Sequence, residues 1–230
     1  MTASGIASGP DQSTDNLKMN MIAHILPSVL VLIMASVIQA QEACIDQIKF
    51  PEVGRWAEYH ADFKGKDPYT MRYAVIGGET REGIGLKWLE LRTVGNKKDG
   101  DVVYQMLVPG SVSQLGEVQA IVMKHGTRPA MKMDGMMLKM IRGQMEKQSF
   151  LNDICKDVTL VGSETVSVPA GKFEGRRYHS AKYSSDSWIS ADVPFSLVKS
   201  VGKDFDLALK GHGDGAKSSI NEEPQSMGGK

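Results

Sequence analysis

The sequence predicts a mainly β (α+β) fold, in which an antiparallel sheet packs against one amphipathic, Met-rich helix. Two observations predict it. Apolar residues alternate with a period of two along a series of short segments after residue 54, and turn residues separate these segments. Only residues 129–148 show instead the 3.6-residue period of a helix.

The first half of the chain predicts five strands. Along 69–76, Tyr69, Met71 and Tyr73 share one face, and Gly77 and Gly78 are expected to end the strand. The remaining strands of this half are expected at 55–63, 84–94, 101–108 and 118–124.

The second half predicts a hairpin followed by three more strands. Residues 158–168 and 172–183 are joined by Pro169-Ala170-Gly171, which suits a type I turn followed by a left-handed residue. Further strands are expected at 186–190, 196–202 and 205–210. Because the chain then becomes rich in Gly, Ser and Glu, we expect a disordered tail over 213–230.

The predicted helix at 129–148 has a methionine-rich apolar face. Its apolar positions follow the i, i+3, i+4, i+7 spacing and are Met133, Met136, Met137, Met140, Ile141 and Met145. Gly135 and Gly143 each cost about 1 kcal/mol relative to Ala inside a helix. The helix therefore needs a partner surface, which a sheet concave toward it would provide.

The N-terminal region is expected to lie outside the β-rich domain, which we place at 41–212. Residues 1–18 are polar and aperiodic, which indicates disorder or a mis-assigned start. Residues 19–40 have the layout of a secretory signal peptide, with an uncharged apolar run that ends at Gln39-Ala40-Gln41. A retained membrane anchor over 21–40 is the alternative, and a lipoprotein attached at Cys44 is a third interpretation that its polar context disfavours.

Cys44 and Cys155 are the two cysteines of the chain, and both follow the predicted cleavage site. In an oxidising compartment we expect them to form a disulfide. Such a bond would stabilise the fold by about 4–5 kcal/mol in the chain-entropy model. Two separate buried thiols are the alternative.

Composition and motifs point away from an enzyme and from nucleic acid. The formal net charge is zero, so the chain has no basic footprint for nucleic acid. Gly110-Ser111-Val112-Ser113 lacks the last glycine of a nucleophile elbow, and no two histidines have the spacing of a zinc site. We therefore expect no catalytic residues, no metal site of that kind and no cofactor.

The methionine cluster has three interpretations, which the sequence leaves open. Methionine fills irregular gaps in a core, and it also forms adaptable walls for apolar ligands. Copper(I) favours thioether ligands, and Met131, Met133, Met136 and Met137 are close in sequence.

Several stretches resemble exported bacterial domains of unassigned function related to the outer-membrane lipoprotein carrier superfamily. They are VPAGKF at 168–173, WIS at 188–190, DVPFSLVK at 192–199, GRWAEY at 54–59 and GAKS at 215–218. The resemblance implies a strongly curved antiparallel sheet, an incomplete β-barrel, with helix over its open side. It also implies an apolar cavity able to hold an acyl chain.

The function predicted is that of an exported, non-enzymatic envelope protein, periplasmic or extracellular, that binds a lipid or other hydrophobic ligand between the sheet and the Met-rich helix. The alternatives are a structural or interaction protein of the envelope without a ligand, and a copper(I)-handling protein. The candidate ligand-binding residues are Trp56, Tyr73, Trp88, Tyr104, Met133, Met136, Met137 and Met140.

Overall fold

The computed structural model describes residues 44, 48–95, 100–110, 117–145, 155 and 157–227, and the side chains of 143–145 are not described. The chain divides into two compact units, residues 1–39 and 40–230, and every described residue belongs to the second. The predicted start, signal peptide and alternative anchor lie outside the described residues.

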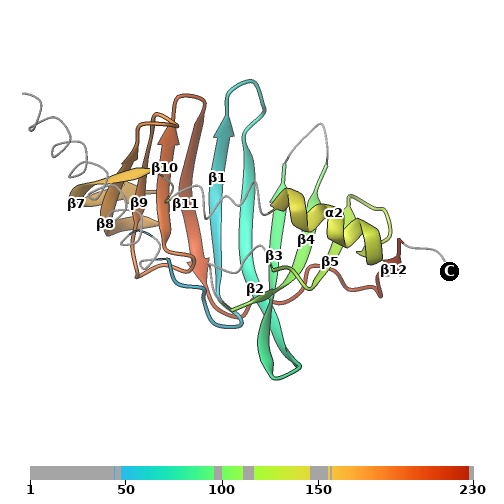
Figure 1. Ribbon diagram of the computed structural model, residues 1–230. Helices are drawn as coiled ribbons and strands as arrows, with labels where there is room; N and C mark the ends of the chain where they lie inside the picture. Colours follow the sequence, from blue (N-terminus) through green and yellow to red (C-terminus); the bar gives the residue numbers. More distant parts are fainter. Residues whose placement is uncertain are drawn as a thin grey trace, which may run out of the picture. The chain divides into compact units, whose positions relative to one another are not determined.

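In the described residues twelve strands form a single sheet, which carries the helix α2 (Gly135–Met145). Figure 1 shows this arrangement. The strands are β1 (Trp56–Phe63), β2 (Tyr69–Arg81), β3 (Ile84–Val94), β4 (Val102–Pro109), β5 (Ala120–His125), β6 (Met131–Met133), β7 (Val158–Val168), β8 (Gly171–Ser180), β9 (Ser185–Ile189), β10 (Leu197–Gly202), β11 (Phe205–Gly213) and β12 (Gln225–Ser226). Their order across the sheet is β12-β6-β5-β4-β3-β2-β1-β11-β10-β9-β8-β7.

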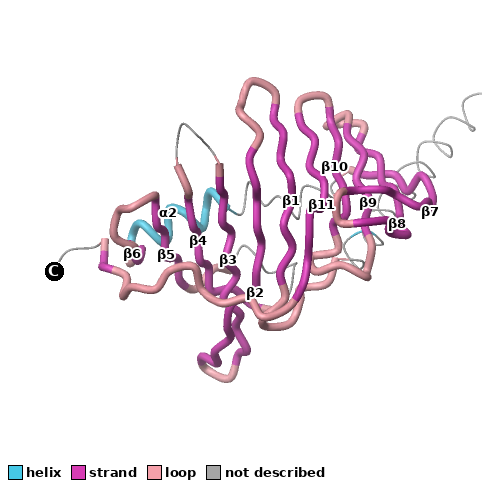
Figure 2. Tube along the Cα trace, turned by 180° about the vertical axis from the view of Figure 1, so that it is seen from behind, coloured by secondary structure: helices cyan, strands magenta, loops and turns pink. Residues whose placement is uncertain are grey.

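The sheet is two antiparallel meanders joined in the middle. Strands β1 to β6 are neighbours in chain order, as are β7 to β11, and β1 pairs with β11 to connect the two sets (Figure 2). Among the strands of the described residues, only β12 runs parallel to its neighbour, β6. The sheet is curved and open, and it is not closed into a barrel, so the predicted mainly β class with one short helix is confirmed.

The strand β2 and the start of the helix differ from the sequence prediction. The strand β2 continues through Gly77 and Gly78, because a register shift between Val75 and Gly77 absorbs the irregularity and pairing with β3 resumes. The start of the predicted helix is the strand β6, in which Met133 pairs with Ile121. The helix begins only at Gly135, whose positive φ of 57° turns the chain out of the sheet.

The main core lies on the inner face of the sheet, which we define as the face that carries Tyr59, Tyr73 and Leu89. Cross-strand pairing aligns buried side chains along this face, as in the row that joins Val75, Leu89, Met106, Ile121 and Met133. From α2, three apolar side chains pack against this core: Met137, Leu138 and Ile141. The helix therefore covers part of the inner face, as expected from its spacing.

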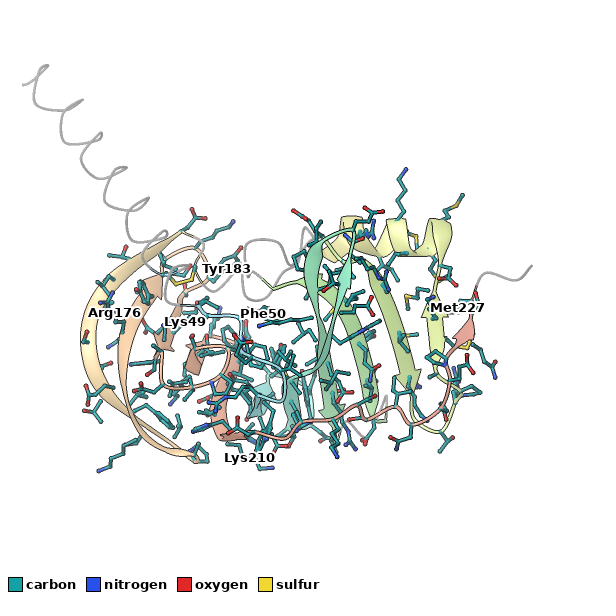
Figure 3. All side chains as sticks on the ribbon, turned by 90° about the horizontal axis from the view of Figure 1, so that it is seen from below. Lys49, Phe50, Arg176, Tyr183, Lys210 and Met227 are labelled. Carbon is teal, nitrogen blue, oxygen red and sulfur yellow. A yellow bond between two sulfur atoms is a disulfide. The ribbon has the colours of Figure 1, made fainter. Side chains whose placement is uncertain are left out.

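A C-terminal strap, residues 214–222, crosses the opposite, outer face of the sheet (Figure 3). Ile220 packs into a small apolar cluster with Val103, Val122 and Ala130. The chain then ends its described course as β12 beside β6. Residues 213–227 thus differ from the disordered tail predicted from composition, because their contacts are made with strands that lie about a hundred residues earlier.

The predicted pairing of Cys44 with Cys155 is confirmed. The two residues are fully buried, form a disulfide and have Cα atoms 5.5 Å apart. They are 111 residues apart in sequence. The bond attaches the beginning of the domain to the connection that follows α2.

Candidate functional site

An apolar cavity of about 420 Å³ lies on the inner face, where β1 to β3 meet β9 to β11. We call it the inner cavity. It is lined by Phe63, Met71, Tyr73, Leu91, Tyr183, Ser185, Ser187, Ser200, Phe205 and Leu207. Because its walls come from both meanders, the cavity depends on the pairing of β1 with β11.

Strand register explains why these side chains gather. Phe63 lies opposite Phe205 across the β1–β11 pair, and their ring centroids are 6.0 Å apart. Along the next two strands Leu207 pairs with Ser200, and Ser200 pairs with Ser187. A period of two keeps each of these residues on the inner face.

The polar groups of the inner cavity are few and uncharged. The hydroxyls of Ser187 and Ser200 are 2.8 Å apart and hydrogen-bonded, and both residues are buried. Burial raises the pKa of the Tyr73 hydroxyl, and the nearby Tyr69 raises it further by a smaller amount. The Tyr73 hydroxyl is therefore neutral at physiological pH. The cavity therefore presents an apolar surface with a few hydrogen-bonding groups.

Of the eight predicted ligand-binding residues, only Tyr73 lines the inner cavity. Trp56 and Trp88 are on the outer face. The indole N–H of Trp56 donates to the carbonyl of Asp214 at 3.1 Å, and that of Trp88 donates to the carboxylate of Glu79 at 3.4 Å. Trp56 pairs with Ala74, whereas the neighbouring Ala57 pairs with Tyr73, so strand alternation turns Trp56 away from Tyr73.

The other predicted residues lie toward the β6 end of the sheet. Met133 is buried in the core, and Met137 packs against that core. Tyr104 lies on the inner face but is 36% exposed. Met136 and Met140 project from α2 and are 88% and 57% exposed.

Sequence reasoning missed the lining residues from β1, β3 and β9 to β11, together with Met71 of β2 and Tyr183 of the turn between β8 and β9. A signal existed, because the alternation of Tyr69, Met71 and Tyr73 was visible, as was that of Phe205 and Leu207. The missing information was the pairing of β1 with β11, since the two strands are separated by more than a hundred residues.

A second cavity, of about 500 Å³, lies beside α2 and is referred to as the methionine cavity. It is lined by Asp134, Gly135, Met136, Met137, Met140 and Met227. Four of these six residues are methionines, and they come from two segments of the chain.

A charged cluster occupies the outer face of β7 to β9. Arg177 donates to Asp186 at 3.0 Å, and the ring nitrogen Nδ1 of His179 is also 3.0 Å from Asp186. The hydrogen bond from Arg177, with a smaller one from His179, lowers the pKa of the Asp186 carboxyl. The Arg177 guanidinium lies over the Trp188 ring, 5.4 Å from its centroid. The cluster is a surface ion-pair network.

In the part of the chain that the structure describes, no three His, Cys, Asp or Glu side chains converge as for a metal ion. In the same part, none of the helices is long and apolar enough to cross a membrane.

Comparison with known proteins gives structural neighbours only. No protein-family model matches the chain, and no curated protein matches it. One neighbour is a crystal structure from Bacteroides fragilis, described as a proposed exported protein with a YmcC-like fold. Its sequence is 12% identical and its TM-score is 0.39, and the alignment covers 73% of this chain and 99% of the neighbour's chain. A second neighbour is a proposed lipoprotein from Parabacteroides distasonis, which is 14% identical and has a TM-score of 0.35. The alignment covers 72% of this chain and 99% of the lipoprotein's chain. Because both TM-scores are low, we draw no conclusion from these neighbours.

Proposed function

We propose that this chain is an exported, non-enzymatic protein that binds one apolar ligand, such as an acyl chain, in the inner cavity. The observation that carries the proposal is the cavity itself. Its volume of about 420 Å³ falls within the range of roughly 300–1,000 Å³ that is usual for small-molecule sites. Seven of its ten lining side chains are apolar or aromatic, and the other three are serines.

The lining favours an apolar ligand over a charged one. None of the ten lining residues is charged, so an ionic group would lose its hydration without gaining a partner of opposite charge. The hydroxyls of Ser187 and Ser200 already bond to each other, so an apolar chain can cover them without leaving either hydroxyl unpaired. Burial of apolar surface supplies about 25 cal/mol for each Å² removed from water.

The proposed site is the inner cavity, which differs from the site expected at the Met-rich helix.

A ligand can reach the lining of the inner cavity. Leu91 and Phe205 are only partly buried beside the cavity, which leaves their side chains accessible to a ligand. Tyr183 is 41% exposed and lies in the turn between β8 and β9, so we assign it to the mouth of the cavity.

A cavity-filling variant tests the proposal. Leu91→Trp places a larger side chain in the space that the ligand is proposed to occupy, and Ile84→Trp makes the same kind of change at a site that is 57% exposed and far from the cavity lining. The probe is a dansyl-labelled fatty acid, followed by its fluorescence. We expect saturable one-to-one binding to the wild type and to Ile84→Trp. For Leu91→Trp we expect an affinity weaker by at least about tenfold, which corresponds to a loss of about 1.4 kcal/mol in binding free energy.

Two results would overturn the proposal. One is the absence of saturable binding to the wild-type chain. The other is equal loss of affinity in the two tryptophan variants. Either outcome would favour a structural or interaction protein of the envelope, with no ligand in the inner cavity.

Export is part of the same proposal. The support is the disulfide between Cys44 and Cys155, since such bonds persist in oxidising compartments, together with the signal-like segment 19–40. The intact mass of the protein purified from the cell envelope tests it. A mature form that begins at about residue 41 supports cleavage, whereas a chain that retains 21–40 and partitions with membranes supports the anchored alternative.

A further inference from the structure

Thioether side chains from two distant parts of the chain line the methionine cavity. Met136, Met137 and Met140 belong to α2, and Met227 follows β12 near the end of the described chain. Nearly ninety residues separate the two segments. The meeting of these side chains is therefore a product of the fold and does not follow from local sequence.

The parallel pairing of β12 with β6 brings Met227 to the helix. Gln225 pairs with Met131 and Ser226 pairs with Lys132. The backbone N–H of Met227 then donates to the carbonyl of Lys132 at 2.9 Å. The hydroxyl of Ser226 donates to the carboxylate of Asp134 at 2.6 Å, which fixes the strand beside the residue that precedes α2.

Helical spacing places Met140 beside both Met136 and Met137. Met136 and Met140 are four residues apart and Met137 and Met140 three apart, so their side chains are neighbours on the helix surface. Three of the four methionines are unusually accessible for an apolar residue: Met136 is 88% exposed, Met140 57% and Met227 39%. Core packing therefore explains Met137 but leaves the other three without a role.

We propose that the methionine cavity is a binding site for a soft monovalent metal ion, copper(I), with Met136, Met140 and Met227 as thioether ligands. Soft thioether ligands select copper(I) over the hard cations that prefer oxygen. The two cysteines are bonded to each other, so they offer no thiolate that would compete for the ion. Asp134 is the one charged residue in the lining, and its carboxylate is paired with the Lys132 ammonium at 3.8 Å, so the thioethers are the groups proposed to bind the ion.

This site is separate from the inner cavity, and the two proposals share no residue. It also differs from the set that the sequence suggested. Met131 and Met133 belong to β6, and Met133 is 4% exposed within the core, so its sulfur is not available to an ion from solvent. In the proposed site Met227 takes the place of Met131 and Met133 as a methionine near the ion.

The test compares two triple variants of the full chain with the wild type. In the site variant Met136, Met140 and Met227 are replaced by Leu. In the control Met106, Met123 and Met133, which belong to the core or pack against it and line neither cavity, are replaced by Leu. Copper(I) affinity is measured without oxygen, by competition with a chromophoric copper(I) chelator. We expect the site variant to lose affinity by about tenfold or more, the loss that even outer-shell changes cause at metal sites, and the control to keep wild-type affinity.

A structural readout locates the ion. Silver(I), a probe of copper(I) that does not change oxidation state, is titrated into protein labelled with carbon-13 at the methionine methyl groups. Single Leu variants assign the resonances of Met136, Met140 and Met227. We expect these three resonances to shift together and to saturate at one silver(I) per chain.

Three results would overturn the assignment. They are equal affinity in the site variant and the wild type, shifts confined to other methionines, and the absence of any binding by the wild-type chain. The variants are expected to fold, because Met-to-Leu exchange costs less than about 1.5 kcal/mol per site. Thermal unfolding monitored by circular dichroism checks that each of them is folded. The methionines outside the described residues are common to all three proteins and cancel in the comparison.

Discussion

Ser219 binds Glu90 across the outer face of the sheet through two hydrogen bonds. The backbone N–H of Ser219 donates to one carboxylate oxygen at 2.8 Å, and its hydroxyl donates to the other at 2.6 Å. Gln105 donates a third bond, at 2.8 Å. Glu90 is fully buried, so the strap supplies most of the hydrogen bonds that this carboxylate would otherwise receive from water.

Ser219→Ala removes one of the bonds to the buried carboxylate. Because hydrogen bonds to charged groups contribute about 1.5–3 kcal/mol, we expect a loss of this size in the free energy of unfolding. Urea unfolding at pH 7 measures it. Ser167→Ala, at an exposed position of β7, is the matched control and should change stability by less than about 0.5 kcal/mol. Equal stability of the two variants would contradict the role given to Ser219.

Ile220→Ala tests the apolar part of the strap. Ile220 is 8% exposed and packs with Val103, Val122 and Ala130. Truncation of a buried Ile costs about 2–5 kcal/mol, and we expect a value near the lower end because the cluster is small. Hydrogen exchange should accelerate at residues 214–222 before the rest of the sheet. Val161→Ala, at a site 56% exposed, should leave exchange in the strap unchanged.

Loss of the disulfide should lower stability by about 4–5 kcal/mol, because it frees a long loop in the unfolded chain. The bond between Cys44 and Cys155 spans 111 residues. The double variant Cys44→Ala/Cys155→Ala is compared with the oxidised wild type by urea unfolding. A difference smaller than about 1 kcal/mol would show that the unfolded chain gains little freedom when the bond is absent.

Tyr59→Phe should change the response of the fold to alkaline pH. Burial, with a smaller effect from Tyr73, raises the pKa of the Tyr59 hydroxyl far above its ordinary value near 10. Above about pH 10 the unfolded chain releases this proton and the folded chain keeps it, so wild-type stability falls as the pH rises.

The variant removes this titration, and its stability should fall less steeply between about pH 10 and 12. At pH 7 it should be less stable by about 1 kcal/mol, because the hydroxyl no longer donates to the carbonyl of Leu197 at 3.0 Å. Urea unfolding across this pH range measures both effects. Parallel stability curves for the two proteins would contradict the prediction.

Most strands could be predicted from the sequence because their signal is local. The alternation along β2, β4 and β11 and the hairpin at Pro169-Ala170 are visible within a few residues, and Val168 indeed pairs with Gly171. The start of α2 could not be placed, because Met131 and Met133 fit a helix and a strand equally well until β5 is available as a partner.

The site was harder to predict, because a face is fixed by pairing between distant strands. Trp56 was assigned to the ligand side, but its pairing with Ala74 and Gly213 puts it on the outer face. The strap was missed for a related reason. Its Gly- and Ser-rich composition resembles a disordered tail, whereas its stability comes from contacts such as Ser219 with Glu90, 129 residues apart.

The pairing of β1 with β11 has a consequence for how the chain folds. Every other antiparallel pair joins strands that follow one another along the chain, so each meander can form from short loops. The β1–β11 pair instead brings Trp56 opposite Gly213 and closes the longest loop among the antiparallel pairs. Since contacts of high sequence separation slow folding, this step should set the refolding rate. The inner cavity is complete only after this step, so any ligand it binds can engage it fully only late in folding.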